Sequence, residues 1–460
     1  MRTFRFFILG AAFILSGCSL APAWQQPALP IPQRFSLSQN RLVDAPAAVQ
    51  DVGWRRFFVD EQARALIDEA LRNNRDLRMA ALKVQEARAQ YRVTDADRYP
   101  QLNAQGSGGW SGKLKSDADS VREYKAGLDL SVDFDLFGRL KNMSEAGRQR
   151  YFASEEARRA VHILLVANVA RSYFSQRLAA AQLELARQTL RNDRQSYAFV
   201  EKQLLTGSAN VLALAQARGV IDNARSEVAR REGELAQANN ALQLLLGSYG
   251  KLPDDRPAGE GDIRSVTLPP SLSSHILLQR PDIMEAERTL MAANADIGAA
   301  RAAFFPSITL TSGLSAAGSD LSNLFSAAGG AWNFIPRLTL PIFNGGRNRA
   351  NLELAEIRQR QAVVGYEQKI QNAFREVADA LALRQSLADR TLDQQRYLAS
   401  LQVTLQRARA LYRHGAVSYI EVLDARRALF ATRQALLDLN YARQANEITL
   451  FTALGGGWVE

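Results

Sequence analysis

The sequence predicts a mixed α+β membrane protein built as a tandem structural repeat. Each chain would supply four strands to a trimeric 12-stranded β-barrel, which continues into a long α-helical coiled-coil barrel with a small mixed equatorial region. Three observations in the 460 residues lead to this prediction. Motifs recur at a nearly constant offset, paired segments alternate apolar and polar residues, and two very long segments carry uninterrupted helical patterning.

The repeat is visible in short motifs about two hundred residues apart. Residues 74–77 (NRDL) resemble 280–283 (RPDI) at an offset of 206, and 206–207 (TG) resemble 414–415 (HG) at an offset of 208. Each match is weak by itself. A nearly constant offset along the whole chain, however, indicates a duplicated unit of about two hundred residues.

The duplication and the N-terminal pattern predict five segments. We expect a signal peptide at 1–17, a lipidated extended segment at 18–60, repeat 1 at 61–255, a linker in the equatorial region at 256–275, and repeat 2 at 276–460. Repeat 1 should hold a first helix, a β-hairpin at about 100–136, a long helix at about 141–205 and a helix at 209–247. Repeat 2 should hold a first helix, a β-hairpin at about 306–343, a long helix at about 346–413 and a helix at 416–454.

The N-terminus resembles the leader of a bacterial lipoprotein. A basic start is followed by an apolar run at 6–14, which is too short to span a membrane as a mature helix. Residues 15–18 (LSGC) then match a lipobox that ends on Cys18, the only cysteine of the chain. We expect cleavage before Cys18, its modification by palmitate or a similar acyl chain, and sorting to the cell outer membrane, because Ser19 follows. An ordinary secretory signal with a chance cysteine is the alternative.

The clearest strand pattern lies at 128–136. Leucine, valine and phenylalanine alternate there with polar residues, as in a strand with one apolar and one polar face. If the apolar face meets lipid, Asp129, Asp133 and Asp135 face a channel lumen, where their charges would concentrate cations. Pairing with a basic residue such as Arg337 would cancel that field.

The long helices are expected to pack as coiled coils. No proline interrupts 141–205, which would form a rod of roughly 90–100 Å. Heptad spacing of apolar residues runs through both repeats, and Gly207 and Gly415 mark tight reversals, so each repeat should end in a long helical hairpin. Four strands cannot close a membrane barrel, whereas three copies would supply twelve strands and leave an aqueous interior.

Composition argues against several other functions. The net charge of +10 is spread along the helices beside acidic residues, without a dense basic block, so nucleic-acid binding is not expected. One cysteine, three histidines and five methionines offer little for redox or metal chemistry. Met284 and Met291 share a helical face, but core packing explains them better than a copper site. We find no nucleophile–base–acid set, and therefore expect no enzyme, no metal site and no cofactor besides the lipid.

Several longer motifs resemble the TolC/OprM-type outer-membrane factor family of tripartite efflux systems. They include RPDIMEAER, AARAAFFPSITLTSG, LPIFNGGRNRA, EVLDARRALF and ALGGGW, and the likeness covers essentially the whole mature chain. Further segments, such as FVEKQLLTGSANVLALAQARG, resemble the copper- and silver-efflux members. The resemblance implies a homotrimeric exit channel that meets a periplasmic membrane-fusion adaptor and an inner-membrane proton-driven RND transporter.

The same resemblance implies where the channel closes at rest. Tyr412 and Arg413 before the second turn, with Ile420, Asp424 and Arg427 after it, would form the constriction and its locking contacts. Residues spaced four and three apart lie on one helical face. The equivalent positions of repeat 1 carry no charge: Leu212, Gln216 and Gly219. An ordinary exposed Asp–Arg pair without a gating role remains the alternative.

Other functions stay open at this level. A multidrug channel of the same family is the alternative, and only the likeness of the whole chain favours a copper(I)/silver(I) channel over it. A lipid-anchored periplasmic coiled-coil adaptor would explain the lipobox and the hairpins, but not the paired alternating strands. A secreted hydrolase has no supporting residues.

Overall fold

A computed structural model describes residues 19–35, 53–111, 121–250, 252, 263, 272–319, 321 and 330–456. Cys18 lies outside these residues. The chain forms two compact units, and each contains parts of both sequence repeats. Unit 1 comprises residues 1–29, 82–157 and 282–369, and unit 2 comprises residues 30–81, 158–281 and 370–460.

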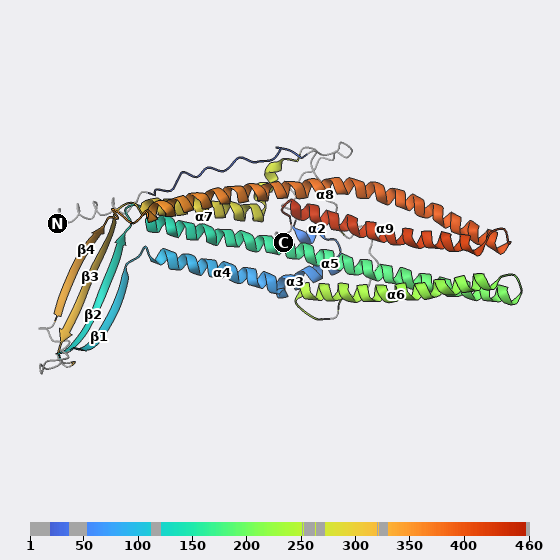
Figure 1. Ribbon diagram of the computed structural model, residues 1–460, viewed down its shortest axis with the longest axis horizontal. Helices are drawn as coiled ribbons and strands as arrows, with labels where there is room; N and C mark the ends of the chain where they lie inside the picture. The colour runs from blue at the N-terminus through green and yellow to red at the C-terminus, as the bar shows by residue number, and fades with distance from the viewer. Residues whose placement is uncertain are drawn as a thin grey trace. The chain divides into compact units, whose positions relative to one another are not determined.

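The helices differ widely in length (Figure 1). In the first half of the chain they are α2 (Trp54–Phe57), α3 (Glu61–Asn73), α4 (Arg75–Ala96), α5 (Arg139–Leu205) and α6 (Val211–Leu246). In the second half they are η2 (Ser274–Gln279), α7 (Pro281–Ala302), α8 (Arg347–Arg413) and α9 (Tyr419–Ala453). Both α5 and α8 have 67 residues, which corresponds to about 100 Å. No helix among the described residues is long and apolar enough to cross a membrane.

One antiparallel sheet of four strands belongs to unit 1 (Figure 1). The strands are β1 (Gln101–Ser111), β2 (Val121–Phe134), β3 (Ser307–Gly318) and β4 (Gly330–Thr339), in the order β1-β2-β3-β4. Each repeat supplies one hairpin, and β2 pairs with β3 between the two hairpins. Because the sheet is open, β1 and β4 are edge strands within the chain. Pro336, which has no N–H to donate, lies on the edge strand β4, where proline is tolerated better than in a central strand.

The register gives the sheet one apolar and one polar face. Leu128 lies between Leu314 and Ala104 in neighbouring strands, and Leu314 lies opposite Trp332 on β4. On the other face, residues such as asparagine, serine, threonine and aspartate follow one another across the strands. The large apolar side chains remain exposed: Leu102, Trp110, Leu128, Phe134, Leu314, Trp332, Phe334 and Leu338. A single chain therefore leaves a broad apolar surface uncovered.

Two helical hairpins, α5–α6 and α8–α9, have their turns in unit 2, whereas α5 and α8 begin in unit 1. At the two turns Gly207 and Gly415 adopt φ values of 71° and 70°, which favour glycine because other residues are strained there. Similar backbone hydrogen bonds close both turns. In the first turn the N–H of Ser208 donates to the carbonyl oxygen of Gln203, and in the second the N–H of Ala416 donates to the carbonyl oxygen of Leu411. The matching turns reflect the sequence duplication.

The core of unit 2 includes a buried polar contact between α3 and α5. Asp60 caps α3 by accepting hydrogen bonds from the backbone N–H groups of Gln62 and Ala63 at 2.7 and 3.1 Å. Its carboxylate also pairs with the buried Arg177 at 2.7 Å and accepts from the Tyr173 hydroxyl at 3.1 Å. Every oxygen of this buried carboxylate therefore has a partner, as a buried charge requires.

Candidate functional site

Asp129 and Asp133 lie on the polar face of the sheet. The carboxylate of Asp133 accepts a hydrogen bond from the Thr309 hydroxyl at 2.6 Å. A Cβ atom at Gly313 would lie 2.7 Å from an Asp129 oxygen, so glycine leaves room for that carboxylate. Arg337 lies opposite Thr309 in the register, yet among the described residues no ion pair joins it to either acid. Within the described part of the sheet, neither carboxylate is therefore ion-paired with a cation, although Arg337 lies on the same face.

The structure places Asp135 differently from these two acids. The strand β2 ends at Phe134 rather than at residue 136, so Asp135 lies in the turn that leads into α5. Its carboxylate accepts a hydrogen bond from the backbone N–H of Lys141 at 2.7 Å. This contact satisfies a backbone donor in the first turn of α5. Asp135 is therefore a helix-capping residue beyond the end of the strand.

The turn of the second hairpin presents an exposed face of α9. Ile420, Asp424 and Arg427 are all exposed, whereas Val422 and Leu423 between them are buried. Arg427 pairs with Asp424 at 3.2 Å, and their side chains are 70% and 62% exposed. An exposed pair at this spacing adds about 0.5 kcal/mol or less to stability. The pair is thus available to a partner surface rather than needed for folding.

Tyr412 differs from its neighbour Arg413, which is exposed. The Tyr412 hydroxyl donates to the side-chain oxygen of Gln203 at 3.0 Å, and its ring packs against Tyr419 with centroids 5.3 Å apart. Burial raises the pKa of Tyr412 above its ordinary value. This hydrogen bond joins the two hairpins of the chain close to their turns.

An ion pair that the sequence analysis missed also joins the hairpins. Arg426 on α9 pairs with Asp193 on α5 at 3.0 Å, with only 17% and 6% of the side chains exposed, and Arg426 also donates to Ser196. Desolvation raises the pKa of Asp193 despite the opposing effect of Arg426. Burial lowers the pKa of the nearby Arg409, and repulsion from Arg426 lowers it further. The guanidinium groups of Arg426 and Arg409 therefore both lie near the buried carboxylate of Asp193.

Apolar packing surrounds these polar contacts. Val200, Leu401, Leu405, Val422 and Leu429 form a buried cluster from α5, α8 and α9. The cluster also includes Ala217 from α6, so all four helices contribute. Near the turns, the two hairpins therefore pack as one unit.

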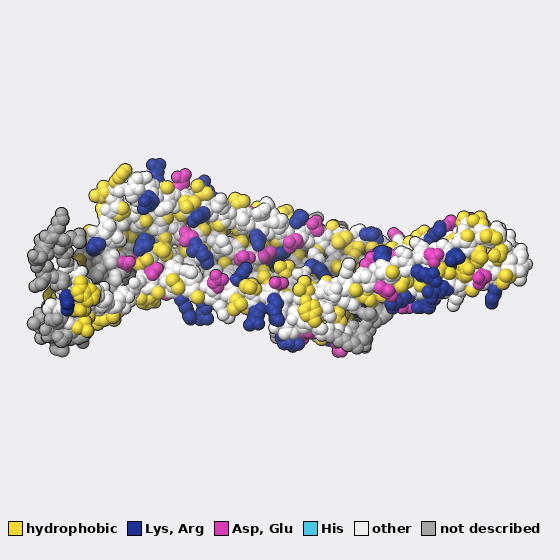
Figure 2. Space-filling view, turned by 60° about the horizontal axis from the view of Figure 1, so that its bottom comes forward, with side chains coloured by type: hydrophobic (Ala, Val, Ile, Leu, Met, Phe, Trp, Pro, Cys, Tyr) yellow, Lys and Arg dark blue, Asp and Glu magenta, His cyan; other side chains and the backbone are white. Residues whose placement is uncertain are grey.

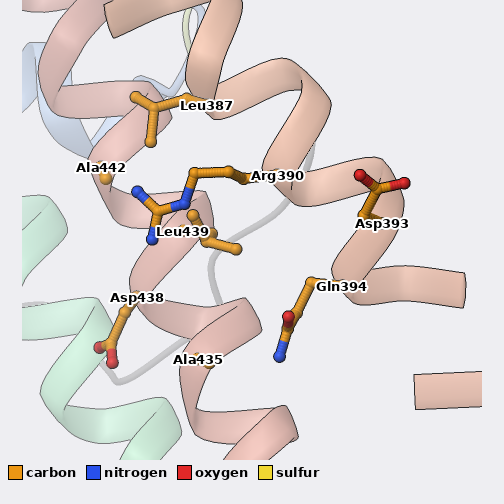
Figure 3. A pocket seen from close by; sticks show the side chains of 8 residues that line it. All are labelled: Leu387, Arg390, Asp393, Gln394, Ala435, Asp438, Leu439 and Ala442. Atoms are coloured by element: carbon orange, nitrogen blue, oxygen red, sulfur yellow. The ribbon is translucent and has the colours of Figure 1, made fainter. Parts of the chain in front are cut away.

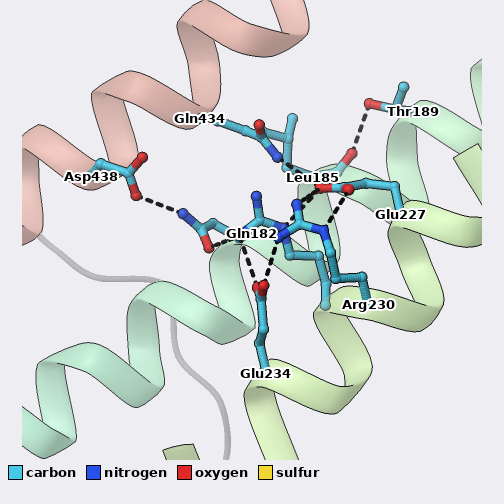
Figure 4. Close-up of polar contacts among 9 residues, drawn as sticks. Gln182, Leu185, Thr189, Glu227, Arg230, Glu234, Gln434 and Asp438 are labelled. Atoms are coloured by element: carbon cyan, nitrogen blue, oxygen red, sulfur yellow. Dashed lines mark hydrogen bonds and ion pairs between the residues drawn. The ribbon is translucent and has the colours of Figure 1, made fainter.

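A polar network joins α5, α6 and α9 farther from the turns (Figure 4). Arg231 pairs with Glu227 at 2.9 Å and with Glu234 at 3.0 Å, and it also donates to Gln182. Gln182 in turn donates to Asp438 of α9 at 2.6 Å. Each charged group in this partly buried network has a partner, which favours a fixed position of the hairpins.

The second hairpin also carries an open groove of about 400 Å³ between α8 and α9 (Figure 3). It is lined by Leu387, Arg390, Asp393, Gln394, Ala435, Asp438, Leu439 and Ala442. Its lining includes the charged residues Arg390, Asp393 and Asp438. On the face shown in Figure 2, basic and acidic side chains are interspersed in the same way along the helices.

The methionines on α7 lie in ordinary packing environments. Met284 and Met291 are both half-buried, and the Met291 sulfur accepts a contact from the Arg288 guanidinium at 3.8 Å. A cation so close to the sulfur disfavours a metal ion there. Within the described part of the chain, no three histidine, cysteine, aspartate or glutamate residues are grouped to hold a metal ion.

The two-faced open sheet and the long helical hairpins are typical of a membrane-associated channel protein. The profile of the outer membrane efflux protein family matches residues 66–248 and 272–456, and the chain belongs to this family. The second match begins 206 residues after the first (272 against 66) and ends 208 residues later (456 against 248), which confirms the predicted duplication.

Particular relatives are similar over nearly their full length. The chain is 73% identical to the cation efflux system protein CusC of Escherichia coli O157:H7 over 447 residues, covering 97% of each chain. It is 67% identical to the probable outer membrane lipoprotein SilC of Salmonella typhimurium over 453 residues, covering 98% of each. A crystal structure of CusC matches with a TM-score of 0.90 and 72% identity, covering 96% of this chain and all of that one.

These findings confirm the predicted tandem fold with four strands per chain, the outer-membrane location and the non-enzymatic class. They also exclude the adaptor and hydrolase alternatives, because the family match covers both repeats. The channel lumen, the gate and the lipid attachment remain predictions of the sequence.

Proposed function

We propose that the protein is the outer-membrane exit channel of a tripartite RND-type efflux system and passively conducts copper(I) or silver(I) ions to the exterior. The two-faced, open sheet is the observation that carries this proposal. Its apolar face suits lipid, its polar face suits a water-filled lumen, and its free edge strands β1 and β4 require further strands. Three chains would close a 12-stranded barrel.

The membrane anchor of this channel would be a lipid on Cys18. Membership of an outer-membrane family and the similarity to a probable lipoprotein support this modification. One acyl chain gives only marginal membrane affinity, whereas closed strands bury a whole apolar band. Cys18→Ser should therefore lose acylation, detected by mass spectrometry, and still form trimers in detergent.

The helical hairpins would extend into the periplasm and close the channel at their turns. The exposed Asp424–Arg427 pair with Ile420 would form the constriction, together with Tyr412 and Arg413. A tripartite system also needs a periplasmic membrane-fusion adaptor and an inner-membrane proton-driven RND transporter as partners. We propose these partners from the family resemblance and the similarity to a cation efflux protein.

The substrate can be tested in a strain that lacks this gene. We expect the deletion to lower resistance to silver and copper salts and to leave resistance to hydrophobic drugs unchanged, with recovery on complementation. Loss of drug resistance with normal metal resistance would instead identify a multidrug channel. Size analysis of the detergent-extracted protein would test the trimer separately.

A further inference from the structure

The first described residues of the chain lie along three helices of unit 1. The Ser19 hydroxyl donates a hydrogen bond to the side-chain oxygen of Asn142 on α5 at 2.7 Å. The Asn294 amide on α7 donates to the carbonyl oxygen of Pro22 at 2.8 Å. Farther along, the Gln26 side chain donates to the hydroxyl of the buried Tyr366 on α8 at 3.3 Å. The segment is thus held at several points along its length.

A glycine allows this segment to approach α7 closely. A Cβ atom at Gly298 would lie 2.7 Å from the Asn142 amide nitrogen and 2.8 Å from both the backbone nitrogen and the Cβ of Ala21. Such distances are too short for non-bonded contact, so a larger residue would displace the segment or the helix. Asn294, Gly298 and Arg301 are spaced four and three apart, which puts them on one face of α7. Arg301 also donates to the carbonyl oxygen of Leu20 at 3.4 Å.

We propose that this face of α7, together with Asn142, is a seat for residues 19–22 that fixes the lipid attachment point on the protein. The seat therefore determines where the acyl chains enter the bilayer relative to the sheet, because Asn142 lies in the first turn of α5, which follows β2. Ser19 directly follows the proposed attachment residue, and adjacent Cα atoms are about 3.8 Å apart, so a seated Ser19 limits how far from α5 and α7 the lipid can be attached. The anchor is a positioned contact rather than a flexible tether. This inference rests on the proposed acylation of Cys18.

The seat can be tested with a nitroxide label at the exposed position Ala23→Cys. The label would be the only one on the chain where acylation blocks the Cys18 thiol, and a preparation found to be unacylated is labelled in the Cys18→Ser background instead. We expect a largely immobile electron paramagnetic resonance spectrum for the trimer. Gly298→Ala should at least double the mobile fraction, since its Cβ would collide with Ala21. Asn294→Ala removes one hydrogen bond and should have an intermediate effect without a steric clash.

Gly365→Ala provides a matched control. Gly365 also lies within a helix of unit 1, and its Cβ would meet nothing within 4 Å. Both alanine substitutions raise helix propensity equally, so a change confined to Gly298→Ala reports the seat. A mobile label in the wild type, or identical spectra for the wild type and both Gly298→Ala and Asn294→Ala, would overturn the proposal.

Mass spectrometry of the same preparations separates the seat from the proposed modification. An acylated wild type with an immobile label supports both. An unacylated wild type with an immobile label would overturn the role in lipid positioning and the proposed modification, while leaving a docked N-terminal segment.

Discussion

At the scale of single residues, two carboxylates on the polar face of the sheet determine the expected ion preference. Asp129→Asn with Asp133→Asn should reduce cation preference, because threefold symmetry would remove six negative charges from the lumen. Reversal potentials in a salt gradient measure this effect. Asp135→Asn serves as the comparison and should change the potential less, since Asp135 caps α5 beyond the strand. Anion preference of the wild type would contradict the lumenal role.

A buried hydroxyl should make stability depend on alkaline pH. Burial, more than any neighbouring charge, raises the pKa of Tyr173 to about 12 from 10.0. A raised pKa stabilises the fold fully below pH 10, and this contribution is lost as pH rises through about 12. The shift corresponds to about 3 kcal/mol at most. Thermal unfolding between pH 10 and 12 should therefore change more in the wild type than in Tyr173→Phe, and equal changes would refute this assignment.

The sequence predicted these residue roles unevenly. Strict alternation placed Asp129 and Asp133 on the polar face, but alternation cannot show that Asp135 is used as a helix cap. Asp193 was missed although it left a signal, since it occupies the heptad position shared by Ala186 and Val200. A charge among apolar heptad positions indicates a buried partner. That partner, Arg426, lies on another helix and could not be identified without the structure.

At the scale of elements, the buried pair between α5 and α9 should matter more than exposed pairs. Arg426→Met should lower the helical unfolding midpoint, because it removes the hydrogen-bonded partner of a buried carboxylate, at a cost of about 3 kcal/mol. Replacing both partners, by Asp193→Leu with Arg426→Met, should restore much of the loss. Circular dichroism in detergent measures both effects.

A matched variant controls for the loss of a positive charge. Arg396 pairs with Asp393 on α8 at 3.2 Å, and both side chains are more than 70% exposed. Arg396→Met should therefore change the midpoint little. If Arg426→Met behaves like Arg396→Met, the buried pair does not hold the hairpins together.

The elements themselves were largely predictable because their patterns are long. Sustained heptads and the lack of proline predicted the long helices, and paired alternation predicted four strands. The start of β2 at Val121 was not predicted, because Val121 and Arg122 break the alternation that Tyr124 and Ala126 share with Leu128. The two compact units likewise could not be read from the repeats, since they arise from contacts between distant segments.

At the scale of the whole molecule, the proposed channel must stay closed when no partner is bound. An outer-membrane tube that is open at rest would leak, and we propose that the exposed Asp424–Arg427 pair beside the second hairpin turn locks neighbouring chains. The buried contacts within each chain would keep its two hairpins together. Opening should then depend on the exposed contacts at the turns.

Single-channel conductance of the trimer in planar bilayers tests this account most directly. We predict little resting current for the wild type and a large increase for Asp424→Ala with Arg427→Ala. The control pair Asp393→Ala with Arg396→Ala has the same spacing, the same 3.2 Å separation and similar exposure, and should behave like the wild type. Equal resting current in the wild type and in the Asp424/Arg427 variant would contradict a passive exit channel that closes at these turns.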